Sequence, residues 1–320
     1  MRVVVAGGAG FLGSHLCDSL LARGDEVLAV DNLSTGSLEN LAHHESTDGF
    51  RFLMADVTHD IPHEGSVDAI VNLASPASPA AYLAMPLETM LVGSEGTRCL
   101  LELAQTHGAR FIQASTSEVY GDPHVHPQRE DYWGNVNPIG PRSVYDESKR
   151  FAEALVMAYR RARATNVGIA RIFNTYGPRL APGDGRVVSN FICQALRGEP
   201  LTVYGDGRQT RSLCYVADTV RGLLSLLDSQ EIGPVNLGNP TELTMLALAQ
   251  EIVKATSSSS TIEFKDLPVD DPQQRCPDIA LAESTLGWAP QVPLRKGLAE
   301  TIHYFESKLQ SYPDASSMTA

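Results

Sequence analysis

The side chains best placed to do chemistry are a phenol and an ammonium on one predicted helix. Tyr145 and Lys149 are four residues apart, so both project from the same helix face. A free phenol has a pKa of about 10 and is a poor base at neutral pH, but nearby positive charge lowers that pKa. The pair could then take the proton of an alcohol while a hydride leaves the same carbon. An exposed pair at this spacing is also common.

A polar segment that follows an apolar run supplies partners for such a reaction. Ser115 to Glu118 come directly after the predicted strand 111–114, at the carboxyl edge where ligands bind in parallel sheets. The Thr116 hydroxyl can hydrogen-bond the reacting oxygen, and Glu118 adds a carboxylate beside a sugar ring. A simple alcohol dehydrogenase does not need that acid. The alternative for Glu118 is a solvated loop carboxylate.

Three glycines near the N-terminus predict a phosphate site. Gly7, Gly10 and Gly13 follow an apolar run at residues 3–6 and open a predicted helix at 11–22. Bare backbone at the start of a helix lets a pyrophosphate approach the N–H groups. The G-x-x-G-x-x-G spacing resembles that of the short-chain dehydrogenase/reductase superfamily. The alternative is a tight turn between strand and helix that binds no ligand.

Asp31 predicts which dinucleotide binds. It ends the second predicted strand, 18 residues after Gly13, where a carboxylate accepts hydrogen bonds from a ribose and repels a 2′-phosphate, so we expect NAD rather than NADP. Asp56 and Val57 follow the third strand and border the adenine, unless they form an ordinary turn. The full set predicted to contact NAD is Gly7, Gly10, Phe11, Leu12, Gly13, Asp31, Asn32, Thr35, Gly36, Asp56, Val57, Leu73, Ser75, Tyr145 and Lys149.

Composition narrows the classes of partner and compartment. The 320 residues carry a formal net charge of −13, which argues against nucleic acid or an anionic membrane as the main partner. Five scattered cysteines form no C-x-x-C pair, so we expect no disulfide framework and a reducing cytoplasm. The chain starts directly in an apolar strand and has no run of 18 apolar residues, which predicts a soluble, unsecreted protein.

Histidine pairs raise the question of a metal. His43-His44 and His124-x-His126 are suggestive, but the sequence places no third ligand near either pair, and we predict no metal site.

Alternation of short apolar runs with helical patterns predicts a doubly wound parallel sheet. The predicted strands are 3–6, 26–31, 52–54, 69–74, 111–114 and 167–172, and the predicted helices between them include 11–22, 87–105 and 143–163. After residue 174 the pattern becomes irregular, with a strand at 201–204 and helices at 188–197, 218–227, 246–255 and 298–309. We predict an NAD-binding domain of residues 1–173 plus about 212–238, a smaller interleaved substrate lobe of 174–211 plus 239–309, and a frayed tail at 310–320.

Longer motifs make the resemblance specific. The segments TSEVYGDPHVHPQREDYWGNVNPIGPRSVYDESKR, RIFNTYGPR, DGRVVSNFICQALRGEPLTVYGDGRQTRS, GPVNLGNP and DDPQQRCPDI span most of the chain. They resemble the UDP-glucuronate decarboxylases (UDP-xylose synthases), which are extended short-chain dehydrogenases.

The resemblance implies three stages in one site. NAD+ takes a hydride from C4 of the glucuronate with the help of Tyr145, the β-keto acid loses CO2, and the C4 ketone is then reduced to give UDP-xylose. It implies catalytic roles for Thr116, Glu118, Tyr145, Lys149 and Arg275, with Glu118 handling the ring and proton traffic around C4 and C5. It implies substrate contacts from Pro79, Tyr82, Asn174, Arg186, Val187, Thr202, Tyr204, Gln209, Arg211 and Arg275. A homodimer paired through helices that include 143–163 is also implied.

Departures from the family pattern keep alternatives open. Leu91, Val92 and Gly93 stand where the family usually has Lys-Thr-Asn, Cys276 replaces a common lysine, and Leu33-Ser34 replaces an aromatic pair. The nearest rival activity is a nucleotide-hexose 4,6-dehydratase, followed by a 4-epimerase. A non-enzymatic NAD-binding regulator is a rival of a different class, but intact Thr116, Glu118, Tyr145 and Lys149 argue against it.

Overall fold

A single parallel sheet organises the larger part of the molecule. The computed structural model describes residues 1–266 and 274–311. Within them, seven strands form a sheet in the order β11-β6-β5-β4-β1-β2-β3, and every neighbouring pair is parallel. The strands are β1 (Arg2–Ala6), β2 (Glu26–Asp31), β3 (Phe50–Met54), β4 (Ala69–Asn72), β5 (Arg110–Thr116), β6 (Val167–Ile172) and β11 (Val235–Leu237). Chain order reverses between β1 and β4, which is where ligands bind in such sheets.

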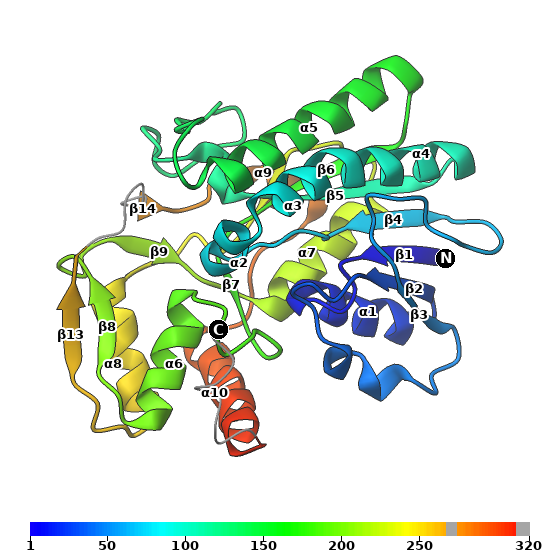
Figure 1. Cartoon of the computed structure of the whole chain (residues 1–320). Helices are drawn as coiled ribbons and strands as arrows, with labels where there is room; N and C mark the ends of the chain where they lie inside the picture. The colour runs from blue at the N-terminus through cyan, green and yellow to red at the C-terminus, as the bar shows by residue number, and fades with distance from the viewer. Residues whose placement is uncertain (267–273, 312–320) are drawn as a thin grey trace.

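Helices cover both faces of this sheet, and the apolar strands explain why. In β1, Val3 and Val5 pack into one core cluster with Leu16 of α1 (Phe11–Ala22), whereas Val4 packs into another with Leu100 of α4 (Thr97–His107). Successive side chains of a strand point to opposite faces, so a continuous apolar run requires a cover on each side. Figure 1 shows α4 and α5 (Ser143–Arg163) on one face and α1 and α7 (Val216–Asp228) on the other. The predicted fold class is confirmed.

A smaller lobe is built from later segments of the chain. β8 (Leu201–Tyr204) pairs in parallel with β13 (Ile262–Lys265), and α6 (Val187–Arg197), α8 (Met245–Ala255) and α10 (Leu294–Ser311) share its core cluster (Figure 1). A three-stranded sheet contains β9 (Thr210–Ser212), β12 (Glu242–Thr244) and β14 (Gln274–Arg275). The remaining elements are β7 (Thr175–Tyr176), β10 (Cys214–Tyr215), α2 (Pro79–Ala84), α3 (Pro86–Leu91), α9 (Ala280–Leu286), η1 (Leu38–Asn40), η2 (Ala42–His44), η3 (Val92–Gly96) and η4 (Ser117–Tyr120).

The chain crosses between the two lobes more than once. α7 and β11 return to the large sheet, and Ala282 of α9 and Trp288 pack in the cluster beneath α1. The exact division into domains stays a prediction. Residues 312–320 of the predicted tail lie outside the described residues, while 310 and 311 complete α10.

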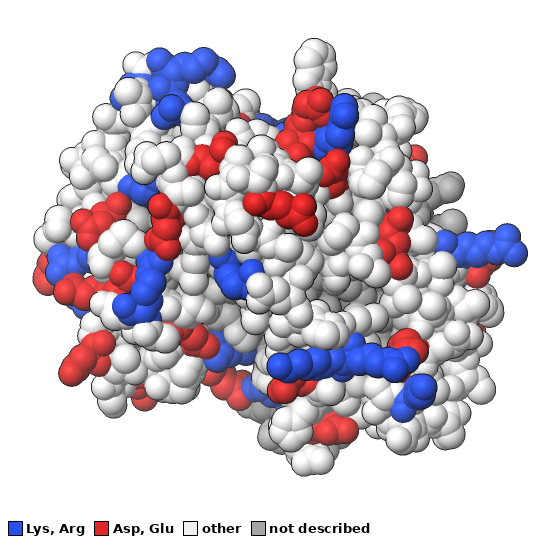
Figure 2. All heavy atoms as spheres, turned by 180° about the vertical axis from the view of Figure 1, so that it is seen from behind, with Lys and Arg blue, Asp and Glu red and all other residues white. Residues whose placement is uncertain are grey.

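Surface charge, helix length and cysteine state bear on the predictions about nucleic acid, membranes and disulfides. On the face shown in Figure 2, lysines and arginines are interspersed with aspartates and glutamates. Among the described residues, no helix combines the length and the apolar character that crossing a membrane requires. All five cysteines are free thiols, and Cys99 is the one among them that is partly exposed.

The predicted helix at 87–105 is helical throughout, but it contains a π-helical turn that the sequence did not predict. α3 ends at Leu91, the residues of η3 form a π-helical turn, and α4 begins at Thr97. Glycine is a weak helix former, and Gly93 and Gly96 both fall in this turn. Single π-helical turns often mark functional regions. This turn lies against α5, the helix that carries Tyr145.

Gly93 is fixed by its contact with α5. A Cβ atom added to Gly93 would lie 2.7 Å from the Cβ of Ser148 and 3.1 Å from its carbonyl oxygen. Real Cβ contacts are essentially never that short. The asparagine that the family resemblance expects at this position therefore cannot sit against Ser148 without movement of α5 or of the turn. The departure at Gly93 has a packing reason in this chain.

We predict that Gly93→Asn lowers the free energy of unfolding by about 1–3 kcal/mol, as overpacking a tight contact does. Combining it with Ser148→Gly, which removes the opposing Cβ, should recover part of that loss, because contacting residues are energetically coupled. Urea denaturation of the two single variants and the double variant measures the coupling.

Gly183→Asn is the matched control, because a Cβ at Gly183 would meet no atom within 4 Å. It should change the unfolding free energy by less than about 0.5 kcal/mol. Strict additivity of Gly93→Asn and Ser148→Gly would show that the Gly93–Ser148 contact is not what excludes the side chain.

Candidate active site

The glycine turn leaves the start of α1 open to a ligand. Gly7 has a φ of +77°, a conformation that L side chains rarely adopt, and a Cβ on Gly13 would lie 2.0 Å from the Gly7 carbonyl oxygen. The N-cap residue is Gly10, so no side chain caps the first N–H groups of α1, and the first turn of the helix has no acidic residue. The free N–H groups and the positive end of the helix dipole therefore suit an anion such as a pyrophosphate.

Asp31 is held at the end of β2 by backbone donors. Its Oδ2 accepts a hydrogen bond from Ala9 N at 3.0 Å, and its Oδ1 accepts one from Leu33 N at 2.8 Å. Burial raises the pKa of this carboxyl, and the backbone hydrogen bonds act against that rise. A Cβ on Gly36 would lie 2.9 Å from Oδ2, so the glycine keeps space beside the carboxylate. Each carboxylate oxygen has a second lone pair for a ribose hydroxyl.

The other predicted cofactor residues follow the carboxyl ends of neighbouring strands. Phe11 and Leu12 begin α1, Leu73 and Ser75 come after β4, and Thr35 lies in the loop after β2. Asn32 Nδ2 donates to Asp56 Oδ2 at 3.0 Å, which joins the loops after β2 and β3. Val57 is buried in the cluster between the sheet and α4. The fold thus brings this set to one edge of the sheet, as ligand binding at the strand reversal requires.

Tyr145 and Lys149 meet Thr116 at the end of β5. Lys149 Nζ donates to the Ala114 carbonyl oxygen at 3.0 Å and lies 5.7 Å from the centre of the Tyr145 ring. Tyr82 of α2 stacks on Tyr145 with ring centres 5.0 Å apart and an angle of 8° between the planes. Tyr145, Lys149 and Thr116 are all buried. The phenol is therefore positioned by packing on one side and by the strand end on the other.

Without a ligand, the protein does not lower the pKa of this phenol. Burial and the negative charge of Glu118 raise the pKa of Tyr145 to about 12. Burial lowers the pKa of Lys149 to about 8, because the charged ammonium loses water. Arg186 lowers the pKa of Tyr145, but too weakly to prevail. Positive charge that a ligand brings beside the phenol would act against this rise.

Glu118 is the centre of a charge cluster. Its Oε1 accepts from Arg275 Nη1 at 2.5 Å, and its Oε2 accepts from Arg142 Nη2 at 2.6 Å. Burial acts to raise the pKa of this carboxyl, but the two guanidinium groups overcome that effect and hold it at about 2. Arg275 Nε and Nη2 are buried and have no hydrogen-bond acceptor among the described residues. Arg275 therefore has two N–H directions left for a ligand.

The predicted substrate residues fall into three groups. Pro79 and Tyr82 lie on α2 beside Tyr145, and the pairing of β9 with β14 sets Arg211 opposite Arg275. In the smaller lobe, Gln209 Nε2 donates to the Tyr204 carbonyl oxygen at 2.7 Å, and Gln194 Nε2 donates to Thr202 Oγ1 at 3.0 Å. The third group lies where the chain enters the smaller lobe. Asn174 precedes β7, Arg186 is the N-cap of α6, and Val187 is the first residue of α6.

Two residues of this site were missed by the sequence reasoning. Arg142 binds Glu118, and Asp146 is buried next to Tyr145. Both lie on α5 or at its start, four residues apart, so they share a helix face. That spacing was visible in the sequence, but nothing in it indicated that the face turns toward Glu118 and Arg275.

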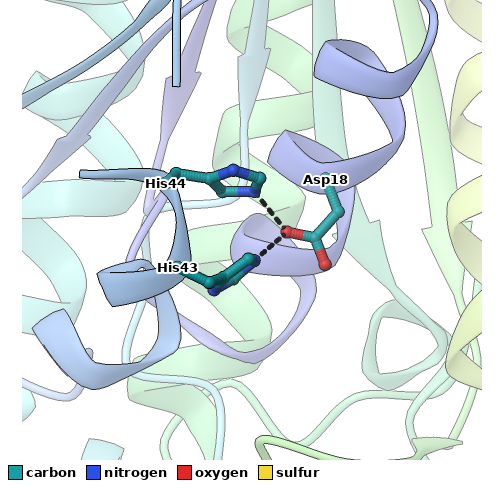
Figure 3. Close-up of side chains that lie close together, drawn as sticks. All are labelled: Asp18, His43 and His44. Atoms are coloured by element: carbon teal, nitrogen blue, oxygen red, sulfur yellow. Dashed lines mark hydrogen bonds and ion pairs between the residues drawn. The ribbon is translucent and has the colours of Figure 1, made fainter. Parts of the chain in front are cut away.

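The structure supplies the third side chain that the sequence did not place beside His43-His44. Asp18 of α1 lies to one side of both rings, with its Oδ1 2.8 Å from His43 Nε2 and 2.7 Å from His44 Nε2 (Figure 3). The other oxygen of Asp18 pairs with Arg179 at 2.8 Å. His126, Glu242 and Cys276 form a second group of this kind. In the first group the guanidinium already neutralises the carboxylate, and a cation would have to bind next to it.

Comparisons with known proteins agree with this site. The model of the NAD dependent epimerase/dehydratase family matches residues 3–238. UDP-glucuronic acid decarboxylase 1 of Arabidopsis thaliana is 53% identical over 97% of this chain and 71% of its own length. The UDP-glucose 4-epimerase of Thermotoga maritima, solved with UDP-glucose, has a TM-score of 0.87 at 30% identity and covers 97% of this chain and 100% of its own.

A second solved structure contains the expected cofactor. UDP-glucuronic acid 4-epimerase from Bacillus cereus, in complex with UDP-glucuronic acid and NAD, has a TM-score of 0.86 at 28% identity over 96% of this chain and 100% of its own. The predicted resemblance to UDP-glucuronate decarboxylases and the prediction of NAD as cofactor are confirmed. With a glycine turn, a strand-end aspartate and a buried Tyr–Lys pair in place, this chain belongs to the NAD dependent epimerase/dehydratase family.

Proposed function

We propose that the protein converts UDP-glucuronate to UDP-xylose and CO2, with NAD recycled within the site. The observation that carries this proposal is the cluster of Glu118, Arg275 and Arg142 beside Tyr145. Hydride transfer at a sugar carbon needs the phenol, whereas a buried arginine with two open N–H directions suits a substrate carboxylate. The identity of 53% to a named UDP-glucuronic acid decarboxylase supports the same substrate.

The residues at the sheet edge fit NAD. The turn at Gly7, Gly10 and Gly13 would hold the pyrophosphate, and Asp31 would hold the adenosine ribose. When bound, NAD+ supplies a hydride acceptor that later returns the hydride, and a positively charged ring. Asp31 would also repel a 2′-phosphate, and its backbone hydrogen bonds oppose the rise in its pKa that burial causes.

The protein's own groups manage the protons of the oxidation. As the hydride leaves C4, the C4 hydroxyl proton passes to the Tyr145 oxygen, and Thr116 holds the same sugar oxygen. Lys149, fixed through Ala114, keeps positive charge beside the phenol. In the last stage Tyr145 returns its proton to the C4 oxygen as the hydride comes back, so Tyr145 ends each turnover as it began.

The ketone at C4 makes the loss of CO2 possible. The C6 carboxylate is β to that ketone, so the electron pair of the C5–C6 bond can move into a C4–C5 enolate. Arg275 can hold the carboxylate through Nε and Nη2 while Nη1 stays on Glu118. A proton then adds to C5. The overall change consumes one proton and leaves the cofactor in its starting oxidation state.

Product analysis tests the proposal directly. Purified protein with UDP-glucuronate and NAD+ should release CO2 and form UDP-xylose, as detected by mass spectrometry. A product isomeric with UDP-glucuronate and no CO2 would instead indicate a 4-epimerase. Turnover of an uncharged nucleotide hexose alone would indicate a 4,6-dehydratase, and NAD binding with no turnover of any nucleotide sugar would indicate a regulator.

We predict that Tyr145→Phe lowers turnover by about 10²–10⁴-fold, because the variant loses the proton acceptor of the oxidation. The ring and its stacking on Tyr82 are kept, so NAD binding and the melting temperature should stay close to wild type. The measurement is the rate of UDP-xylose formation alongside NAD titration. Tyr120→Phe is a control for loss of a buried phenol, because Tyr120 binds Asn236 outside the cluster of Tyr145. Wild-type turnover in Tyr145→Phe would remove the phenol from the mechanism.

We also propose that the protein is a homodimer paired through α3 and α5, in a reducing cytoplasm that suits its free thiols. α3 packs on α5, and large apolar side chains on these helices and on α2 are exposed: Leu83, Leu87, Met90, Leu91 and Phe151. Leu87 is 73% exposed and Phe151 is 51% exposed. Exposed apolar side chains gathered on adjacent helices are typical of protein interfaces.

Sedimentation tests the dimer. The wild type should show twice the mass of one chain, and Leu87→Asp combined with Phe151→Asp should shift it toward one, because buried unpaired charges oppose association. Phe264→Asp, a change of an equally exposed residue on β13, should leave the mass unchanged. A wild-type monomer would contradict the proposal.

A further inference from the structure

Asp146 is a buried acid that the roles proposed above do not use. It lies on α5 directly after Tyr145 and is 6% exposed. Its Oδ1 is buried and has no hydrogen-bond donor among the described residues. A buried carboxyl oxygen without a partner costs free energy, so its retention indicates a use.

The groups around Asp146 belong to the proposed substrate site. The charges of Glu118 on η4, Arg142 at the start of α5 and Arg275 on β14 all act on the pKa of Asp146. Tyr82 of α2 also interacts with Asp146, and its hydroxyl is likewise buried without a partner. Glu147, the adjacent acid, pairs with Arg150 instead. Polar atoms of Asp146, Tyr82 and Arg275 thus lack partners among the described residues, and each of these residues adjoins Tyr145 or Glu118, which suits a polar ligand.

The two carboxyls of this site have opposite surroundings. Glu118 takes one guanidinium on each oxygen, and these contacts keep it ionised. Asp146 Oδ1 has no such contact, and burial together with the negative charge of Glu118 raises the pKa of Asp146 to about 7. Near neutral pH a proton is therefore available on Asp146 and absent from Glu118. Two neighbouring acids with separated pKa values commonly divide into a proton donor and a charged group.

We propose that Asp146 donates the proton that is added to C5 after CO2 leaves, an assignment that rests on the proposed decarboxylation. The C5–C6 bond breaks, its electron pair forms the C4–C5 enolate, and that pair then forms the new C5–H bond with the Asp146 proton. Asp146 is left as a carboxylate and regains a proton from solvent before the next turnover. No electron enters or leaves in this step, so no further reactant is required.

This assignment differs from the one that the sequence favoured. The family resemblance assigned the proton transfers around C4 and C5 to Glu118. An acid that is held ionised by two arginines is a poor proton donor near neutral pH. Glu118 instead fixes Arg142 and Arg275 in place, and Arg275 keeps its remaining N–H groups for the substrate.

The test is Asp146→Asn, which keeps the size of the side chain and removes the transferable proton. In D2O the wild type should place deuterium at one of the two C5 positions of UDP-xylose. In the variant, solvent protonates the enolate without a fixed donor, so deuterium should appear at both positions and turnover should fall by about 10²–10⁴-fold.

The pH profile gives a second readout. The wild-type rate should fall as pH rises above about 7, because Asp146 then loses its proton. This fall is the basic limb of the pH profile, and Asp146→Asn should lack this limb. Asp146→Glu, which keeps an acid, should retain the limb and one-sided labelling. Glu147→Gln, a change of the adjacent acid that pairs with Arg150, should keep both the limb and one-sided labelling, with the limb moved to slightly lower pH, because the charge of Glu147 helps to raise the pKa of Asp146.

The outcomes separate this inference from the proposed function. If the wild type releases CO2 but Asp146→Asn keeps both the limb and one-sided labelling, Asp146 is not the donor while the decarboxylation stands. If the wild type releases no CO2 from UDP-glucuronate, both proposals fall. If Asp146→Asn does not fold, a wild-type profile without the limb overturns the inference on its own.

Discussion

The ion cluster of Glu118 with Arg275 and Arg142 joins parts of the chain that are far apart in sequence. Glu118 follows the central strand β5, Arg142 begins α5, and Arg275 lies on β14, whose partner strand β9 belongs to the three-stranded sheet. Removing one member of a buried charge pair commonly costs about 3–5 kcal/mol, because the remaining charge is left without compensation. The arrangement of the site and the docking of β14 are therefore one constraint: the carboxylate finds both guanidinium groups only when all three elements are in place.

Burial around this cluster determines which groups of the site carry a proton. The surroundings oppose charge on Tyr145, Lys149 and Asp146, and they favour charge on Glu118 alone, because only Glu118 has two cations in contact. Without ligands the protein thus stores protons on the phenol and on Asp146. A ligand with positive charge beside the phenol would favour its ionised form, so the chemistry depends on cofactor binding as well as on residue placement.

Local signals in the sequence were sufficient for the elements that carry the site, and insufficient for the contacts between them. Unbroken apolar runs and a helical repeat predicted β2, β6, α1 and α5 at their observed bounds. Three features depend on how distant segments pack: the pairing of Glu118 with Arg142, the burial of Asp146 and the position of Asp18 beside two histidines. The π-helical turn escaped prediction for the same reason: it forms where Gly93 meets Ser148, which is 55 positions later in the chain (148 minus 93).

In the proposed function, the departure from the family at residues 91–93 leaves Arg275 to bind the negative charge of the substrate. Leu91 is 55% exposed on α3 and offers no cation. The contact with Ser148 leaves no room for a side chain at Gly93. The lysine that the resemblance expects near the substrate is therefore absent, and no side chain at 93 can replace it. Arg275 has one N–H bonded to Glu118 and two more without an acceptor among the described residues, so it can bind a carboxylate without releasing its anchor. Because a guanidinium presents its donors in a planar fork, one arginine fixed in this way can both neutralise and orient the group that is to leave as CO2.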